Sequence, residues 1–308
     1  MVRLTKKQRG EHLFVYSVFA YPMLLFLIFY VFVNFNSILL AFEEIDSTGQ
    51  PSFAGAENFI RFFRDLADSA NVLQTSVVNS LLLFGVGLLI TLPLSIIFSF
   101  YLYKKFFLHL PIRIIVMIPS IASTFIISLL FKKFVEEALP GLMMKIGVEN
   151  FPKLLANAKY SYPTVLFYMV WISFSGNLII LPNAMNAISD SVIESAELDG
   201  ANLFEEFWHI VLPQIYPTLT TFLITSVAGI FTASGPLIEF YMYSAPPETW
   251  NFGYYITVQT MLNADELKSY IIYPYLAATG IVVTLVSAPL TFLVKWILDK
   301  FDFTEDKG

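Results

Sequence analysis

Six long stretches of this sequence contain no Asp, Glu, Lys or Arg, and they limit what the chain can fold into more than any other feature. They cover residues 13–42, 69–103, 114–131, 160–189, 207–238 and 269–294. A charged side chain at the centre of a bilayer costs roughly 2.5–3.5 kcal/mol on insertion scales, whereas about 20 apolar residues allow a helix to cross it. Each stretch is therefore predicted to span a membrane.

The spanning elements are predicted to be helices, because a transmembrane barrel would show segments of about 10 residues with alternating polarity and these stretches are continuous. Composition agrees, since only 14% of the residues are charged and a typical soluble domain has about 25%. We expect an all-α, polytopic membrane protein with six transmembrane helices, forming a single transmembrane domain over residues 1–308.

Charge and composition also exclude several functions. The net charge is −6 and no Lys/Arg-rich run is present, so nucleic-acid binding is not expected. The absence of cysteine excludes disulfides, a thiolate nucleophile and a Cys-ligated metal. No GxxxxGK[ST] phosphate loop occurs, and His12, His109 and His209 are too scattered for a zinc site. We expect no catalytic residue, no metal and no cofactor in this chain.

The distribution of lysine and arginine gives a weak preference for orientation. With the N-terminus in the cytoplasm, the inner segments hold ten of these residues and the outer segments eight. Four of them, Arg3, Lys6, Lys7 and Arg9, precede the first stretch, which shows no cleavage pattern and is predicted to be a retained span. The segment 132–159 opposes this orientation, although three glutamates partly balance its lysines. We expect cytoplasmic N- and C-termini.

The first outer segment, residues 43–68, contains apolar residues at helical spacing. It is predicted either to form a short amphipathic helix on the membrane surface or to be an ordered loop. The residues are Phe59, Ile60, Phe62, Phe63 and Leu66.

The connection between the fourth and fifth stretches has an unusual composition. Residues 190–206 contain six acidic side chains and no lysine or arginine, which inverts the charge expected for a cytoplasmic loop. Ser191 followed by Glu194 fits a capping box at a helix start. Gly200 lies where a helix C-terminus favours a residue that can adopt a left-handed conformation. A short helix ending in a bend is predicted.

A second short helix is predicted to follow the bend. Asn202 followed by Glu205 repeats the capping pattern, and the helix is expected to run through 207–211 until Pro213, which lacks a backbone donor. The two helices would form a compact bent element that projects from the membrane.

Residues 194–213 also follow a spaced pattern that reads EAA, two variable positions, DGA, five variable, F, two variable, I, one variable, LP. Nine of its ten specified residues are present, and Ser195 replaces the second alanine. The loop thereby resembles the EAA loop of permease subunits of bacterial binding-protein-dependent ABC importers. The matching residues are Glu194, Ala196, Asp199, Gly200, Ala201, Phe207, Ile210, Leu212 and Pro213.

The resemblance implies that the loop at about 190–213 is a cytoplasmic coupling helix that docks into a cleft on an ATPase, which would bind ATP and Mg. Small residues permit close helix approach and carboxylates can pair with basic groups on a partner, which agrees with this role. Gly200 would set the angle between the two helices. The implied docking residues are Glu194, Ser195, Ala196, Asp199, Gly200 and Ala201.

The likeness extends beyond the loop. Six spans, a basic N-terminus, Gly176-Asn177 and Gly235-Pro236 resemble the carbohydrate-uptake branch, which includes the larger maltose permease subunit and glycerol-phosphate permeases. The resemblance implies a multi-pass subunit of the bacterial inner (plasma) membrane that moves an oligosaccharide or other carbohydrate by alternating access. Its implied partners are a second permease subunit, two ATPase subunits and an extracytoplasmic solute-binding protein.

Small and weakly polar residues of the fourth and fifth spans are candidates for the substrate pathway, because polar groups near the bilayer midplane line a cavity or pair with another helix. Helix packing is the alternative explanation for such residues. Asn177 is the leading candidate, since its amide can both donate to and accept from a sugar hydroxyl. The candidates are Ser173, Gly176, Asn177, Ser226, Gly229, Ile230 and Ala233.

Several alternatives stay open. Tyr168, Trp171, Tyr241 and Tyr243 could stack on sugars, anchor the membrane interface or belong to the core. The outer segment 241–250 could contact a binding protein or simply cap the spans. A polyol phosphate, peptide or amino acid is an alternative cargo, although spans without lysine or arginine favour a neutral solute. A membrane-embedded enzyme or channel would need intramembrane acids or histidines, and these spans are short of both.

Overall fold

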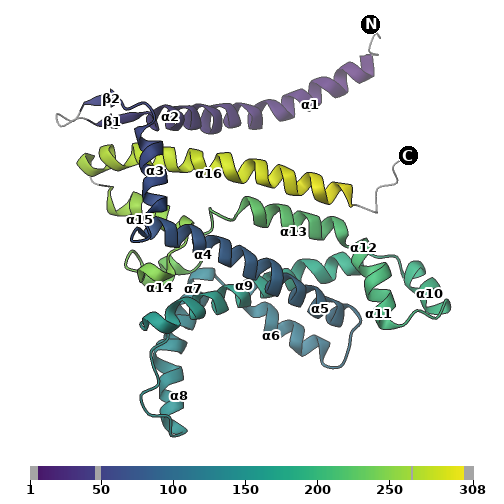
Figure 1. Cartoon of the computed structure of the whole chain (residues 1–308). Coiled ribbons are helices and arrows are strands. Elements are labelled where there is room, and N and C mark those ends of the chain that lie inside the picture. The colour runs from purple at the N-terminus through teal and green to yellow at the C-terminus, as the bar shows by residue number, and fades with distance from the viewer. Residues whose placement is uncertain (1–5, 46–49, 265, 302–308) are drawn as a thin grey trace. The chain divides into compact units, whose positions relative to one another are not determined.

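The structure is a computed structural model that describes residues 6–45, 50–264 and 266–301. Helices form nearly all of the regular structure, which confirms the all-α fold class (Figure 1). The helices are α1 (Lys6–Leu25), α2 (Val33–Leu40), α3 (Glu57–Ala67), α4 (Val72–Val86), α5 (Leu92–Tyr103), α6 (His109–Ile121), α7 (Thr124–Lys133), α8 (Leu139–Lys145), α9 (Ala158–Asn186), α10 (Asp190–Leu198), α11 (Leu203–Glu206), α12 (Leu212–Gln214), α13 (Tyr216–Ala228), α14 (Leu237–Tyr241), α15 (Phe252–Leu262) and α16 (Glu266–Lys300), with a 3-10 turn at Pro247–Thr249.

Four of the six predicted spans are continuous helical segments that are long and apolar enough to cross a membrane. The third and fifth predicted spans are each a pair of helices with a sharp bend, so the total is six if each bent pair counts as one span. The polytopic membrane class is thus confirmed. The four continuous segments are Phe14–Leu40, Val72–Tyr103, Ala158–Asn186 and Ile271–Lys300.

The third predicted span contains a sharp break. The helices His109–Ile121 and Thr124–Lys145 meet at 104°. Pro119 removes one backbone donor from the last turn of α6, and both Ala122 and Ser123 leave the helical conformation (ψ 158° and 126°). The apolar composition predicts burial in lipid but does not report this break.

The fifth predicted span, 207–238, is also broken. The segments Leu203–Gln214 and Tyr216–Ala228 are bent by 63° at Ile215, which lies between Pro213 and Pro217. Helix α13 then ends at Ala228, with Gly229 as its C-cap, and the chain stays irregular until α14.

Three π-helical turns share one sequence feature, a proline two residues after the turn ends. A proline in a regular α-helix lacks the N–H for its hydrogen bond, and its ring clashes with the carbonyl four residues earlier. In each case that carbonyl lies inside the wider π turn, so the helix continues past the proline. The pairs are Gly87–Thr91 with Pro93, Phe134–Ala138 with Pro140, and Phe207–Val211 with Pro213.

The described chain divides into two compact units. The smaller unit comprises Met1–Arg64 with Asn263–Val283, and the larger comprises Asp65–Leu262 with Thr284–Gly308. In the smaller unit a two-stranded antiparallel hairpin, β1 (Glu43–Ile45) and β2 (Pro51–Phe53), precedes α3. The Asn58 amide donates to the carbonyl oxygens of Ala41 (3.1 Å) and Glu43 (2.8 Å) and thereby joins α3 to the hairpin.

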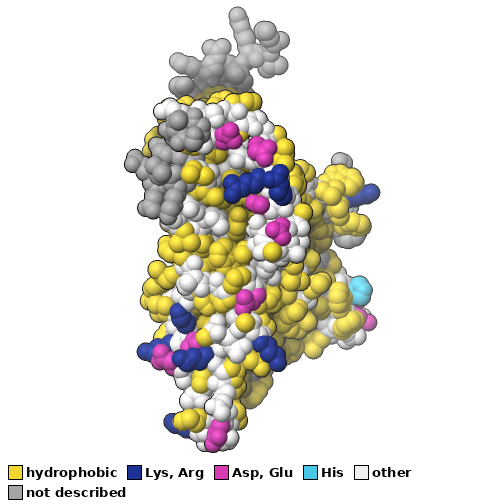
Figure 2. Space-filling model, turned by 60° about the vertical axis from the view of Figure 1, so that its left-hand side comes forward, with side chains coloured by type: hydrophobic (Ala, Val, Ile, Leu, Met, Phe, Trp, Pro, Cys, Tyr) yellow, Lys and Arg dark blue, Asp and Glu magenta, His cyan; other side chains and the backbone are white. Residues whose placement is uncertain are grey.

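Helix α3 confirms the helical spacing predicted for the first outer segment. Phe62 is buried, whereas Ile60 and Phe63 are exposed, and the Arg61 guanidinium lies 4.4 Å from the ring centre of Tyr275. Its location on a membrane surface stays a prediction. Figure 2 shows one face of the molecule, on which hydrophobic side chains cover broad areas and charged side chains gather in a few groups.

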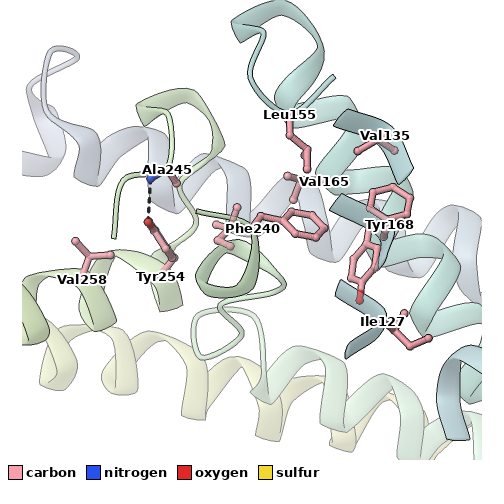
Figure 3. Packing of buried hydrophobic residues seen from close by; sticks show 11 residues of the cluster. Ile127, Val135, Leu155, Val165, Tyr168, Phe240, Ala245, Tyr254 and Val258 are labelled. Carbon is pink, nitrogen blue, oxygen red and sulfur yellow. Dashed lines mark hydrogen bonds between the residues drawn. The ribbon is translucent and has the colours of Figure 1, made fainter. Parts of the chain in front are cut away.

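The larger unit has an aromatic core formed by α7, α9, α14 and α15 (Figure 3). The rings of Tyr168 and Phe240 meet edge to face at 5.1 Å, and the Tyr168 hydroxyl is 2.7 Å from the Ser128 hydroxyl. The Tyr254 hydroxyl accepts from the Ala245 N–H and donates to the Met242 carbonyl. Tyr168 is therefore a core residue, one of the roles left open by the sequence. Trp171 and Tyr241 pack against the same cluster, whereas Tyr243 is exposed.

Candidate functional site

The acidic loop forms the predicted bent element, with Gly200 at the bend. Helix α10 ends at Leu198, and Gly200 has a left-handed backbone (φ 85°). The Gly200 N–H donates to the Glu197 carbonyl (3.1 Å), and the Ala201 N–H donates to the Ala196 carbonyl (3.0 Å). These two bonds form a Schellman motif, which confirms the predicted helix end.

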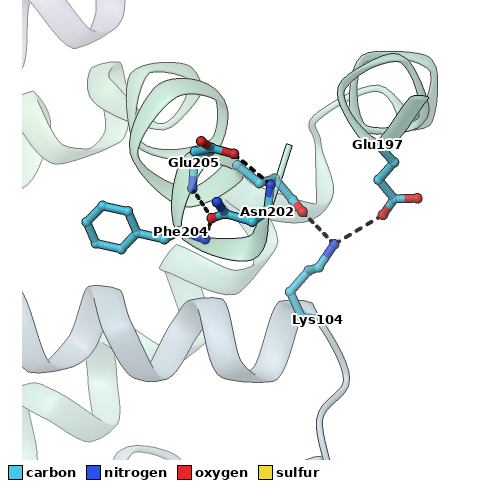
Figure 4. Close-up of polar contacts among 6 residues, drawn as sticks. Lys104, Glu197, Asn202, Phe204 and Glu205 are labelled. Atoms are coloured by element: carbon cyan, nitrogen blue, oxygen red, sulfur yellow. Dashed lines mark hydrogen bonds and ion pairs between the residues drawn. The ribbon is translucent and has the colours of Figure 1, made fainter. Parts of the chain in front are cut away.

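The second arm begins with the capping box predicted from Asn202 and Glu205. The Asn202 side chain accepts from the N–H groups of Phe204 (3.0 Å) and Glu205 (3.1 Å), and the Glu205 carboxylate accepts from the Asn202 N–H (2.8 Å) (Figure 4). The arm continues through the π turn and α12 to Gln214, one residue beyond the predicted end at Pro213, because the wider turn accommodates that proline.

The capping box predicted for Ser191 and Glu194 is wrong. Helix α10 begins at Asp190, so Ser191 lies inside the first turn, and the N-cap is Ser189, which makes no side-chain capping hydrogen bond. The Ser189 and Ser191 hydroxyls instead lie 2.8 Å apart. Asp190 favours the earlier start, because an acidic side chain in the first turn interacts well with the helix dipole.

The implied docking residues lie together around the bend. Glu194, Ser195, Asp199 and Gly200 are exposed, Ala201 is half-buried and Ala196 is buried. The Ser195 hydroxyl donates to the Ser191 carbonyl (2.7 Å), so the serine that replaces alanine satisfies its polar group within its own helix. Their role in docking stays a prediction.

An ion pair that the sequence did not predict joins the bent element to the end of the second span. The Lys104 ammonium donates to Glu206 Oε2 at 2.8 Å and lies 3.6 Å from Glu197 Oε1 (Figure 4). Burial alone lowers the pKa of Lys104, but the hydrogen bond to Glu206 and the charges of Glu206 and Glu197 outweigh it and raise that pKa above its ordinary value. Lys104 is therefore fully charged at neutral pH.

A cavity of about 180 Å³ lies between the second, fourth and fifth spans, and it brings three of the predicted pathway residues together. Ser173, Asn177 and Ser226 line it. The lining also includes Thr91 and Gly87 of the second span, which the sequence analysis missed. The sequence feature that could have indicated these two residues is a glycine and a threonine close to Pro93 inside an uncharged stretch.

Some polar groups in and beside the cavity have hydrogen-bond partners, and one has none among the described residues. The Asn177 amide donates to the Ser95 hydroxyl (3.1 Å), which donates to the Thr91 carbonyl (2.7 Å). The Thr91 hydroxyl is buried and has no hydrogen-bond partner among the described residues. A buried hydroxyl usually has a partner, so the Thr91 hydroxyl is an exception within the described residues.

The spacing of three or four residues between the fifth-span candidates predicts that they share one helix face, and this prediction is wrong for the last of them. Because α13 ends at Ala228, Ile230 and Ala233 lie in an irregular segment, and Gly229 caps the helix. Ile230 is only 6% exposed. Among the residues that line the cavity, Gly176, Gly229, Ile230 and Ala233 do not occur, whereas Ser226 does.

The segment around Trp250 is hydrogen-bonded to the second span. The Asn79 amide donates to the carbonyl oxygens of Glu248 (2.9 Å) and Trp250 (2.8 Å), and the Ser80 hydroxyl accepts from the Phe252 N–H (2.9 Å). Helix α15 follows directly, between the fifth and sixth predicted spans, where the sequence analysis predicted no helix.

Replacing Asn79 by aspartate should destabilise the chain by about 1–3 kcal/mol, because the two carbonyls would lose their donor and face a carboxylate. We expect a lower Tm of the purified protein in detergent and faster proteolysis of residues 242–251. Asn183→Asp is the matched control, since Asn183 is exposed and donates only within α9. Equal stability of the two variants would show that the hydrogen bonds of Asn79 do not stabilise the chain.

The chain belongs to a family of transport proteins. Residues 87–304 match the family described as binding-protein-dependent transport system inner membrane component. The match begins in the second span and includes the cavity, the bent element and α16. The chain is therefore a permease component of such a transport system.

Curated relatives are similar over most of their length. Protein LplB of Bacillus subtilis is 24% identical over 91% of this chain and 87% of its own. The sn-glycerol-3-phosphate transport system permease protein UgpA of Yersinia pestis is 26% identical over 69% of this chain and 71% of its own length. The arabinooligosaccharides transport system permease protein AraP of Bacillus subtilis is 25% identical over 73% of this chain and 73% of its own length.

A solved structure has the same fold. A chain of a bacterial ABC transporter for the acidic polysaccharide alginate has a TM-score of 0.74 at 19% identity, covering 97% of this chain and 99% of that one. In a second structure of the alginate transporter (TM-score 0.73), the transporter is in complex with an alginate pentasaccharide-bound periplasmic protein.

Proposed function

We propose that this chain is the permease subunit of an ATP-driven carbohydrate importer and that its bent element docks onto a cytoplasmic ATPase. The observation that carries the proposal is the Schellman bend at Gly200, which presents Glu194 and Asp199 on an exposed surface within a spaced family motif. The ATPase would bind ATP and Mg²⁺, and this chain would hydrolyse nothing. Both described ends of the chain would then continue into the cytoplasm.

Carbohydrate is the cargo that the cavity chemistry favours. The polar residues of its lining, Thr91, Ser173, Asn177 and Ser226, carry hydroxyl or amide groups, and the lining has no charged side chain. Such groups pair with sugar hydroxyls as donors and acceptors. AraP carries arabinooligosaccharides by its name, whereas UgpA favours a second candidate, a polyol phosphate. An anion would need a cationic partner, which this lining does not offer.

Transport would proceed by alternating access. Closure of two ATPase subunits would displace the bent element, and near rigid-body motion of the attached helices would turn the cavity from one side to the other. A second permease chain would complete the pathway and a solute-binding protein would deliver the cargo from outside.

Isolation of the complex tests the proposal. The tagged chain is purified in mild detergent from its native membrane, and co-purifying proteins are identified by mass spectrometry. We expect an ATPase, a second permease and a solute-binding protein, which can then be titrated with neutral oligosaccharides and with glycerol phosphate. Recovery of the chain alone would contradict the importer, and binding of glycerol phosphate only would select the second cargo.

Asn177→Ala should reduce carbohydrate uptake by reconstituted complexes roughly 2–10-fold, the loss expected for one hydrogen bond between neutral groups. The ATPase should still assemble, because Asn177 lies away from the bent element. Asn183→Ala, on the exposed side of the same helix, is the control and should transport normally. If both variants transport at the wild-type rate, Asn177 is not part of the pathway.

A further inference from the structure

The ion pair at Lys104 joins elements that are far apart in sequence. Lys104 directly follows α5, whereas Glu197 lies in α10 and Glu206 is the last residue of α11. The two acids therefore belong to opposite arms of the bend at Gly200. A single ammonium group at the end of the second span contacts both arms (Figure 4).

The contact between Lys104 and Glu206 is buried, whereas the contact with Glu197 is exposed on the glutamate side. Glu206 is 3% exposed and the Lys104 side chain 16%, whereas Glu197 is 60% exposed. A carboxylate taken out of water needs a counter-charge, because an unpaired buried charge is strongly unfavourable. The other oxygen of Glu206, Oε1, is buried and has no hydrogen-bond partner among the described residues, so its compensation comes from Lys104.

Apolar packing reinforces the same connection. The rings of Phe100 and Phe207 meet edge to face at 5.0 Å, and Phe100 packs against a buried cluster that includes Val211 and Ile215. Helix α5 is therefore attached to the second arm by a buried charge pair and by aromatic contact.

The other end of α5 reaches the cavity. Thr91 and Leu92, where the π turn passes into α5, line it, and Lys104 follows the last residue of the same helix. An α-helix transmits displacement along its axis because its hydrogen bonds form within the segment. The second span thus links the bent element to the cavity wall by a route separate from the covalent connections through α9 and α12.

We propose that Lys104 is a positioning residue that makes the bent element and the second span move as one body. Displacement of α10 and α11 by a bound ATPase then reaches Thr91 and the cavity through α5. This inference rests on the proposed coupling function, and it assigns the transmission to a residue outside the EAA motif. Glu206 is the principal anchor and Glu197 the weaker one, according to their distances and burial.

The first test measures solute transported per ATP hydrolysed in liposomes that contain the complete importer. Lys104→Met should lower this ratio at least fivefold with the ATPase still bound, and Lys104→Arg should restore at least half of it. Lys105→Met is the matched control, because Lys105 is the exposed neighbouring lysine and its loss removes the same charge. An unchanged ratio in Lys104→Met would overturn the proposal.

The second test leaves Lys104 in place and so does not depend on the folding of that variant. The chain has no native cysteine, so Phe107→Cys and Val192→Cys, both at exposed positions, can carry spin labels beyond α5 and in α10. The distance between the labels should stay constant within about 2 Å, the size of an ordinary helix shift, between nucleotide-free and ATP-bound complexes. A larger change would show that the two elements move independently.

The two proposals fail in distinguishable ways. A wild-type chain that captures no ATPase overturns the coupling function and the role of Lys104 together. A wild-type complex that transports, with a normal ratio in Lys104→Met or a large label displacement, overturns only the role of Lys104.

Discussion

Gly200→Val is expected to reduce solute uptake roughly 5–30-fold while ATP hydrolysis continues, because a left-handed backbone costs a residue with a Cβ about 1–2 kcal/mol and a β-branched side chain tolerates it poorly. The strain favours opening of the Schellman motif, which would change the angle between α10 and α11. The measurement is uptake and ATPase activity of the same reconstituted complex.

A second substitution separates backbone strain from a docking clash. Asn is larger than alanine but adopts the left-handed conformation more readily than most residues. A Cβ at position 200 meets nothing within 4 Å in this chain. Gly200→Asn should therefore keep most of the uptake, with Gly200→Ala between the two. If Asn and Val lose uptake equally, side-chain bulk at the ATPase surface is the cause and the angle argument is wrong.

Gly253→Ala is expected to destabilise the chain by about 3 kcal/mol, the upper end of the usual range for overpacking. An added Cβ would lie 2.6 Å from the carbonyl carbon and oxygen of Ala233 and 2.7 Å from the Thr232 carbonyl oxygen. Backbone atoms cannot rotate away as a side chain can, so α15 would have to separate from the segment after α13. Thermal unfolding in detergent should show a markedly lower Tm.

Gly85→Ala is the matched control for this substitution. Gly85 lies within α4, and a Cβ there meets nothing within 4 Å. Alanine is the better helix former by about 1 kcal/mol, so this variant should be as stable as the wild type or more stable. A Gly253→Ala protein with an unchanged Tm would mean that α15 does not approach the Ala233 segment closely.

The local rules in the sequence were sufficient for the bent element. A glycine after the first helix and an Asn-x-x-Glu box before the second each depend on residues within one turn, and both appear in the structure as predicted. The start of α10 was missed because three candidate caps, Ser189, Asp190 and Ser191, are adjacent and the pattern does not rank them. The four unbroken spans were also accessible, since hydrophobicity reports burial in lipid directly.

Features that depend on tertiary structure could not be predicted from the sequence. Hydrophobicity does not distinguish a straight span from one bent at Ala122 or Ile215, because lipid accepts both. The pairing of Lys104 with Glu206 joins positions 102 residues apart in sequence, and one sequence alone contains no signal for it. Thr91 was overlooked because a threonine in an uncharged stretch can equally well serve helix packing as line a solute pathway.

The prolines at 93, 140 and 213 also affect how the helix faces align. A π turn contains about one residue more than an α turn, so side chains beyond it are offset by about 100° from where a regular 3.6-residue count would place them. In the second span, which is one continuous helical segment, this turn lies between Asn79 and Lys104. The angular phase between the contacts of Asn79 with the Trp250 segment and those of Lys104 with the bent element is thus set by a proline, and relatives without it would need a different spacing to present the same faces.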